Sequence, residues 1–183
     1  MSATEDFLRA SSAVGKLVAA ILPEQWDEPT PCAEWTLRQL VNHLIDVNYS
    51  LSERLGGPGG GADDDPAAAY QQSVLALSET LTRPGVLEQT YPGPFAHTTG
   101  DNQLRIRMAD LLTHGWDLAQ STGVPADLPA DLVENALGLV EQRAGAFARS
   151  GKFGTPQPVA AGAPVLDRLA AQTGRTVRLP SSR

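Results

Sequence analysis

Apolar residues recur every three or four positions along most of this chain, which is the period that places them on one face of an α-helix. The pattern predicts helices from Thr4 to Pro23, over residues 36–55, and from Pro66 to Pro84. It predicts two more over residues 102–122 and 130–150, and a short amphipathic turn over 165–172. No alternating strand pattern competes, although one or two short strands could lie in the loops. We therefore expect an all-α bundle.

Several predicted helix ends carry residues that satisfy free backbone groups. Thr4 and Thr36 are placed as N-caps, and Gln39 lies three residues after Thr36, as in a capping box. Asp65 precedes a proline that suits the first position of a helix. Gly123 is expected just beyond the end of the helix over 102–122. The segment 85–100 between the third and fourth helices is long for a simple connector.

Composition narrows the function classes. With 183 residues, 42% hydrophobic and 19% charged, the chain can form one ordinary domain, and we expect 1–183 to be that domain. Its formal charge of −7, without a Lys or Arg cluster, argues against a nucleic-acid partner. No apolar run approaches the roughly 20 residues that cross a bilayer. The N-terminal MSATEDFLRA is acidic where a leader would be basic, so we expect a cytoplasmic protein.

A metal site is the chemistry that the helical pattern favours most. His43 falls on the apolar side of the second predicted helix, while Asp110 and His114 lie one turn apart on the apolar stripe of the fourth. A buried carboxylate and buried imidazoles are costly without partners, and a divalent ion would satisfy them together. Two nitrogens and one carboxylate oxygen suit Zn²⁺, or Ni²⁺, Co²⁺ or another first-row ion. With one cysteine, the chain has no multi-cysteine zinc motif.

The same residues have a plainer interpretation without metal. Asp110 could accept a hydrogen bond from His114 or pair with Arg107 one turn earlier, and His43 could be a core histidine with satisfied nitrogens. In that case the inward polar residues of a metal-free bundle pair with one another.

Other residues have weaker claims to the site. Asp117 could orient a ligand imidazole from behind, or be a surface charge, and Asp46 has the same ambiguity beside His43. Cys32 is expected to be buried and inert rather than activated by a helix N-terminus. His97 in the long loop is expected to be solvated rather than to line a substrate entrance. The aromatic side chains expected to be packing anchors are Trp26, Trp35 and Trp116.

Three stretches of the chain resemble a known family. They are PTPCAEWT (29–36) with VNHL (41–44), then DLLTHGWDLA (110–119), and finally KFG (152–154) with DRL (167–169) and the Gly-Arg at 174–175. They resemble the DinB/YfiT-like metalloenzymes, in the branch related to the N-terminal metal-binding domain of mycothiol-dependent maleylpyruvate isomerase. The resemblance implies a DinB-like four-helix bundle, with an additional short C-terminal helix, that holds metal through His43, Asp110 and His114.

The resemblance has two departures. The isomerase has Glu at the position of Asp110, which is one methylene shorter and leaves the identity of the metal open. The isomerase also has a second domain that contributes to its active site; we expect none here and do not carry over its reaction.

The hypothesis that follows is a metal-dependent enzyme with a small-molecule substrate, in which a thiol such as mycothiol supports group transfer or isomerisation. Hydrolysis by a metal-bound water is an alternative. Another is a non-catalytic metal-binding or stress-response bundle. A homodimer is possible, although no residue argues for it.

Overall fold

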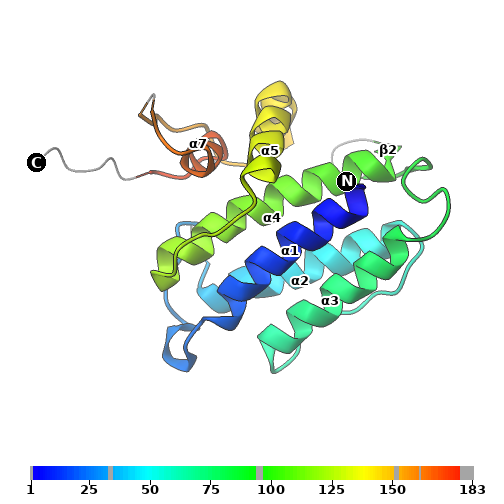
Figure 1. Cartoon of the computed structure of the whole chain (residues 1–183), viewed down its shortest axis with the longest axis horizontal. Helices are drawn as coiled ribbons and strands as arrows, with labels where there is room; N and C mark the ends of the chain where they lie inside the picture. The colour runs from blue at the N-terminus through cyan, green and yellow to red at the C-terminus, as the bar shows by residue number, and fades with distance from the viewer. Residues whose placement is uncertain (1, 33–34, 94–96, 151–152, 161, 178–183) are drawn as a thin grey trace, which may run out of the picture.

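The structure, a computed structural model, describes residues 2–32, 35–93, 97–160 without 151–152, and 162–177 (Figure 1). Ala33 and Glu34 of the first family motif, Phe95 of the long loop and Lys152 of the third motif lie outside the described residues.

Four long helices form the bundle: α1 (Ala3–Ala19), α2 (Leu37–Arg54), α3 (Pro66–Leu81) and α4 (Gly100–Thr122). Helix α1 packs against α3 and α4, and α2 packs against the same two helices. The order around the bundle is therefore α1, α3, α2, α4 (Figure 1). Leucines and other aliphatic side chains from all four helices fill its centre. The expected all-α four-helix bundle is confirmed.

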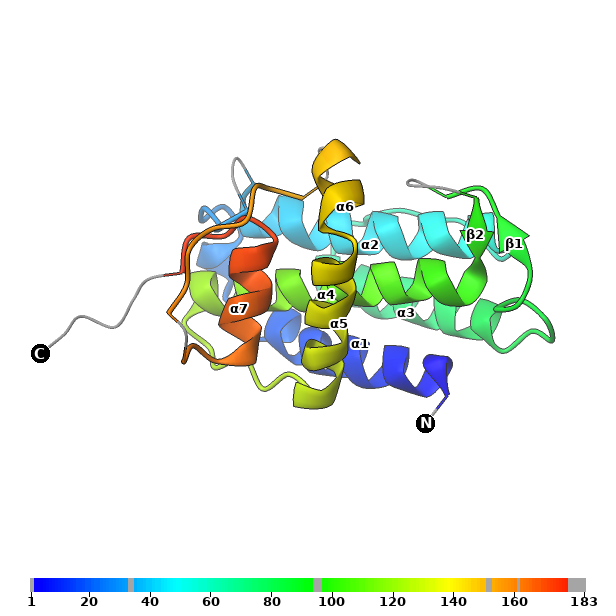
Figure 2. The same cartoon turned by 90° about the horizontal axis from the view of Figure 1, so that it is seen from above.

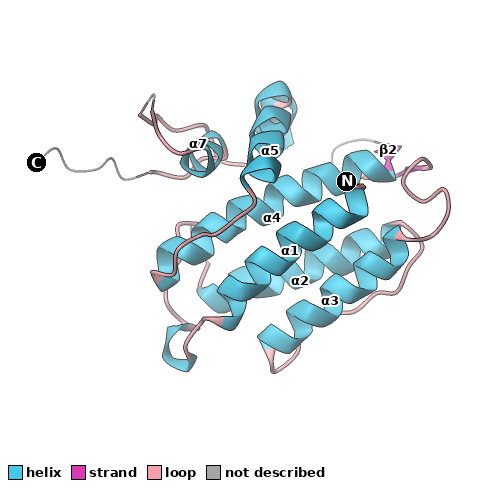
Figure 3. Cartoon of the chain, in the orientation of Figure 1, coloured by secondary structure: helices cyan, strands magenta, loops and turns pink. Residues whose placement is uncertain are grey.

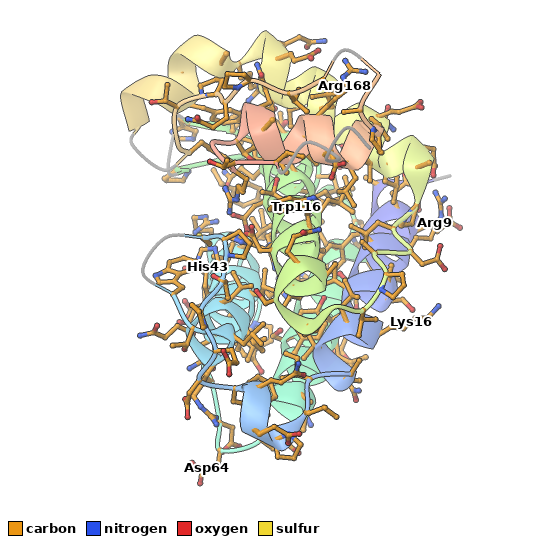
Figure 4. All side chains as sticks on the ribbon, turned by 90° about the vertical axis from the view of Figure 1, so that its left-hand side faces the viewer. Arg9, Lys16, His43, Asp64, Trp116 and Arg168 are labelled. Atoms are coloured by element: carbon orange, nitrogen blue, oxygen red, sulfur yellow. The ribbon has the colours of Figure 1, made fainter. Side chains whose placement is uncertain are left out.

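A second group of helices covers the outer side of α4. Helices α5 (Ala130–Gln142) and α7 (Val165–Gln172) pack on each other and on α4, and Figure 2 shows both alongside it. Residues 111–119 of α4 are consequently all buried. Trp116, labelled in Figure 4, donates from Nε1 to Asp167 Oδ1 of α7 at 2.7 Å. Because this part of α4 has neighbours on all sides, polar groups on any face of residues 111–119 can be buried.

Most of the expected helix ends are confirmed. Thr36 Oγ1 accepts from the Gln39 backbone N–H at 3.3 Å, and the Gln39 side chain accepts from the Thr36 N–H at 2.9 Å, which completes the capping box. Asp65 caps α3 through two backbone N–H groups. Gly123 ends α4 with φ 74°, a conformation that glycine adopts without a Cβ penalty.

Three expectations about the elements need correction. The cap of α1 is Ser2 rather than Thr4, because Ser2 forms a reciprocal capping box with Glu5. The predicted helix 130–150 is interrupted at Arg143, whose side chain donates to Asn102 Oδ1 of α4, and α6 (Ala144–Ser150) follows. Helix α4 begins at Gly100, two residues before the predicted start, because Thr99 caps it.

The connections contain little other regular structure. A short 3₁₀ helix, η1 (Pro23–Gln25), follows α1. Strands β1 (Thr90–Tyr91) and β2 (Thr98–Thr99) pair antiparallel just before α4 (Figure 2), and β2 is the strand labelled in Figure 3. Within the described residues, no helix combines the length and the apolar character needed to span a membrane.

The capping box of α2 predicts a stability effect. Thr36→Ala removes the acceptor for the Gln39 N–H and should lower the free energy of unfolding by about 1 kcal/mol. Thr36→Ser keeps the hydroxyl and should lose less than half as much. Urea unfolding curves with unchanged slopes would check this; equal stability of the Ala variant and the wild type would contradict it.

Candidate metal centre

The three predicted ligands come together across the interface between α2 and α4. Nε2 of His43, labelled in Figure 4, lies 3.5 Å from Asp110 Oδ1, and Nε2 of His114 lies 3.4 Å from the same oxygen. The donor atoms of this group all lie within 4.8 Å of one another. Two ligands bound about 2.1 Å from a tetrahedral zinc ion would be about 3.4 Å apart. The group could therefore hold a metal ion with little rearrangement.

The two oxygens of Asp110 have different partners. Oδ2 accepts from Arg107 Nη1 at 2.7 Å, which leaves Oδ1 facing the two imidazoles. Burial alone would raise the pKa of Asp110, but His114, His43 and Arg107 outweigh it and hold that pKa well below its usual range. The pairing with Arg107, expected only in the metal-free interpretation, is therefore compatible with a metal site. A single carboxylate serves both contacts.

Arg107 is a buried cation that joins α4 to α2. Its side chain is 1% exposed, and it donates from Nε to Asn48 Oδ1 at 2.8 Å and from Nη2 to the Leu44 carbonyl at 3.0 Å. Burial lowers the pKa of Arg107, and the Asp110 carboxylate opposes that shift. Asn48 in turn donates to Ser73 Oγ of α3. This network fixes the carboxylate of Asp110 before any ion is bound.

His114 is oriented from behind by a second acid–arginine pair. Its Nδ1 lies 2.9 Å from Asp117 Oδ2, and Asp117 is fully buried. Arg175 donates to both carboxylate oxygens of Asp117, from Nη2 to Oδ2 at 2.7 Å and from Nε to Oδ1 at 3.1 Å. Because an ionised carboxylate only accepts, we assign a hydrogen of His114 to Nδ1, so that Nε2 faces Asp110 and is the nitrogen that can bind a metal once it is deprotonated. Burial alone would lower the pKa of His114, but Asp110 and Asp117 raise it overall.

The two candidates for an orienting acid are placed very differently. Asp117 lies in contact with a predicted ligand, where such an acid belongs, and its influence on metal binding stays a prediction. Asp46 is exposed on α2, so the structure does not bring it to the site. Arg175 was noted in the sequence only as part of the third family motif. Nothing in the local sequence indicates that it pairs with Asp117, which lies 58 positions earlier.

A cavity of about 570 Å³ opens beside the three residues, and its wall includes His43, Asp110 and His114. Trp35, expected to be a packing anchor, also lines it, with its ring 4.7 Å from that of His43 and 5.8 Å from that of His114. Cys32 lines the cavity as well and is half-buried rather than fully buried. Burial raises the pKa of its thiol, which keeps it protonated near neutral pH.

The described residues contain a second group of possible ligands, Cys32, His114 and Asp117. It is less suited to a cation, because both oxygens of Asp117 already accept from Arg175. His97, the remaining histidine of the chain, is exposed in the loop before α4, as expected.

The fold and the site define a helical bundle with a His–Asp–His cluster at a cavity. The sequence profile of the mycothiol maleylpyruvate isomerase N-terminal domain matches residues 7–92. Two uncharacterized proteins of Mycobacterium tuberculosis, MT0763 of strain CDC 1551 and Rv0738 of strain H37Rv, are each 33% identical over 174 residues. The alignment covers 93% of this chain and 96% of theirs.

The chain therefore belongs to the mycothiol maleylpyruvate isomerase N-terminal domain family, as the sequence motifs predicted. No solved structure gives a significant match. The matched profile includes His43 but ends before α4, so the positions of Asp110 and His114 rest on the structure and the sequence motif.

The buried position of Arg107 predicts a large loss of stability on its removal. Arg107→Met leaves Asp110 and Asn48 without their cationic donor and should lower the free energy of unfolding by about 3 kcal/mol. Arg105→Met, at an exposed ion pair with Asp101 on the same helix, should change it by less than about 1 kcal/mol. Urea denaturation measures both, and equal effects would show that burial does not set the cost.

Proposed function

We propose that this protein is a divalent-metal-dependent enzyme that acts on a small molecule, with the ion held by His43, Asp110 and His114. The observation that carries the proposal is the convergence of three ligand atoms, at spacings of 3.4 and 3.5 Å about Asp110 Oδ1, on the wall of a cavity. Zinc suits this donor set, and Ni²⁺, Co²⁺ or another first-row ion could also be accepted.

The number of protein ligands supports a catalytic rather than a structural role. Structural zinc sites are closed by four protein ligands, whereas catalytic sites keep a position open. Among the described residues, Cys32 and Asp117 form their own group with His114 and do not join His43 and Asp110. The open side of a three-ligand site would face the cavity, whose volume is in the range typical of small-molecule sites.

The chemistry would then be divided between the ion and the protein. A bound divalent ion would supply Lewis acidity, which lowers the pKa of a water or thiol at its open position. The protein's part is to hold the ligands: Arg107 fixes the Asp110 carboxylate, and Asp117 fixes the ring and tautomer of His114. Trp35 packs against both imidazoles and shields them from part of the solvent.

For the reaction class we propose a thiol-dependent transferase or isomerase, with mycothiol as the candidate thiol. The support is the family to which the chain belongs, whose name refers to a mycothiol-dependent isomerase. The protonated Cys32 is poorly placed to supply the thiolate itself, because burial raises its pKa. An external thiol reaching the open side of the site from the cavity is the arrangement that these residues allow.

Metal content tests the ligand set. Wild-type protein loaded with Zn²⁺ and then dialysed should retain about one equivalent per chain by elemental analysis, and His114→Ala should retain almost none because it removes a ligand from α4. His97→Ala, at the exposed loop histidine, should retain as much as the wild type. Equal retention by the His114 and wild-type proteins would refute this ligand set.

Thiol access is tested separately with the cobalt-substituted protein. Titration with mycothiol should add a thiolate-to-cobalt charge-transfer band in the near ultraviolet, because a thiolate occupies the open position. The same band in Cys32→Ser would show that the added thiol is its source. An unchanged spectrum with mycothiol, cysteine and glutathione would refute the thiol-dependent reaction and leave hydrolysis as the alternative.

A further inference from the structure

The cavity extends well beyond the three candidate ligands. It follows the groove between α2 and α4 from His43 and Asp110 to Arg54 and Gln103, which are joined by a hydrogen bond from Arg54 Nε to Gln103 Oε1 at 3.2 Å. Seven residues of helix separate Asp110 from Gln103, a rise of about 10 Å. The wall is therefore long enough for a molecule whose two ends meet different chemistry.

Two arginines at the far end differ from those at the candidate metal centre. Arg107 and Arg175 are each paired with an aspartate, whereas Arg54 and Arg143 have no carboxylate within 4.0 Å among the described residues. Among the described residues, these two guanidiniums donate hydrogen bonds to neutral amides: Arg54 to Gln103, and Arg143 to Asn102. Both line the cavity.

The arginine at position 54 is held in place at a cost. Burial lowers its pKa, and among the described residues no nearby acid offsets that shift. Its partner Gln103 is 4% exposed and is itself fixed by donating to the carbonyls of Tyr91 and Thr98. Arg54 Nε is thereby oriented by a buried amide, and its two terminal nitrogens make no hydrogen bond in the described part of the chain.

Between the two ends the wall has an apolar stretch, beside Arg107, which is paired with Asp110. Val47 of α2 and Ile106 of α4 line the cavity between the candidate ligands and the paired Arg54 and Gln103. A partly desolvated guanidinium without a counter-charge is a strong site for an oxyanion, because charge-assisted hydrogen bonds are shorter and stronger than neutral ones.

We propose that Arg54 and Arg143 form an oxyanion-binding subsite that holds a carboxylate or phosphate group of the substrate, about 10 Å of helix away from the candidate metal centre. The substrate class is a small elongated molecule with an apolar middle and an anionic end. Its identification as a substrate rests on the proposed function, whereas the binding of the anion does not.

Calorimetric titration with octanoate tests the subsite, since this probe has one carboxylate and an apolar chain of suitable length. Octanoate should bind the wild type more tightly than 1-octanol does, and Arg54→Gln and Arg143→Gln should each weaken it by about tenfold. The affinity for 1-octanol should not change. Arg38→Gln, at an exposed arginine of α2 outside the cavity, is the matched control and should bind octanoate like the wild type.

Three results would overturn the subsite. They are equal binding of octanoate and 1-octanol by the wild type, wild-type affinity for octanoate in both cavity variants, or no octanoate binding at all. If one variant fails to fold by circular dichroism, the other still decides the outcome. Octyl phosphate identifies the head group: tighter binding than octanoate assigns a phosphate, weaker binding a carboxylate, and dependence on the two arginines supports the subsite in either case.

The His114→Ala protein separates this proposal from the proposed function. Octanoate held by the two arginines should still bind this variant, whereas octanoate bound to the metal ion would be lost there and would survive Arg54→Gln. Retained, arginine-dependent binding in a wild type that holds no metal would refute the metal enzyme and keep the subsite. Stoichiometric metal in a wild type whose octanoate binding does not depend on the two arginines would refute the subsite and leave the proposed metal enzyme standing.

Discussion

The guanidinium of Arg107 lies between α2 and α4, and each of its three nitrogens donates to a different group. Two of those groups, Leu44 and Asn48, belong to α2, and the third is the Asp110 carboxylate of α4. A cation buried to this degree is tolerated only when it is fully paired. The contact thus holds the two helices in register and turns one oxygen of Asp110 toward His43 and His114. The arrangement of the candidate ligands depends on this one side chain.

The same principle recurs about two helical turns further along the same stripe of α4. Asp117 is fully buried, and its charge is balanced by Arg175, which follows α7 in the chain. Just before Arg175, the backbone of Gly174 lies against that of Gly154. A Cβ on Gly174 would come within 2.5 Å of Gly154 Cα, and the φ of 98° at Gly174 also favours glycine. The C-terminal region therefore does more than cover the bundle. It supplies the cation that allows an ionised acid to orient His114.

The features that could be predicted from the sequence are those set by residues close together in the chain, such as helices and their caps. The apolar period located every bundle helix, and the caps at Thr36, Asp65 and Gly123 could be recognised because their partners lie within four residues. His43, Asp110 and His114 could be proposed because each lies on an inward face. The break at Arg143 and the role of Arg175 depend on contacts with α4 from distant segments, which no local pattern contains. Burial all around residues 111–119 of α4 was missed for the same reason, since a single stripe is expected of a helix with one packed face.

Charge balance connects the candidate metal centre with the subsite at Arg54 and Arg143. Asp110 and Asp117 are offset by Arg107 and Arg175, so these four side chains are neutral together before any ion binds. A divalent cation held by the two histidines and Asp110 would give this end of the cavity two net positive charges. Arg54 and Arg143, which have no carboxylate partner among the described residues, add to them. In a chain with a formal charge of −7, such a concentration of positive charge is local to the cavity. Its field would favour anionic ligands over neutral ones of the same shape, both at the ion and at the far end.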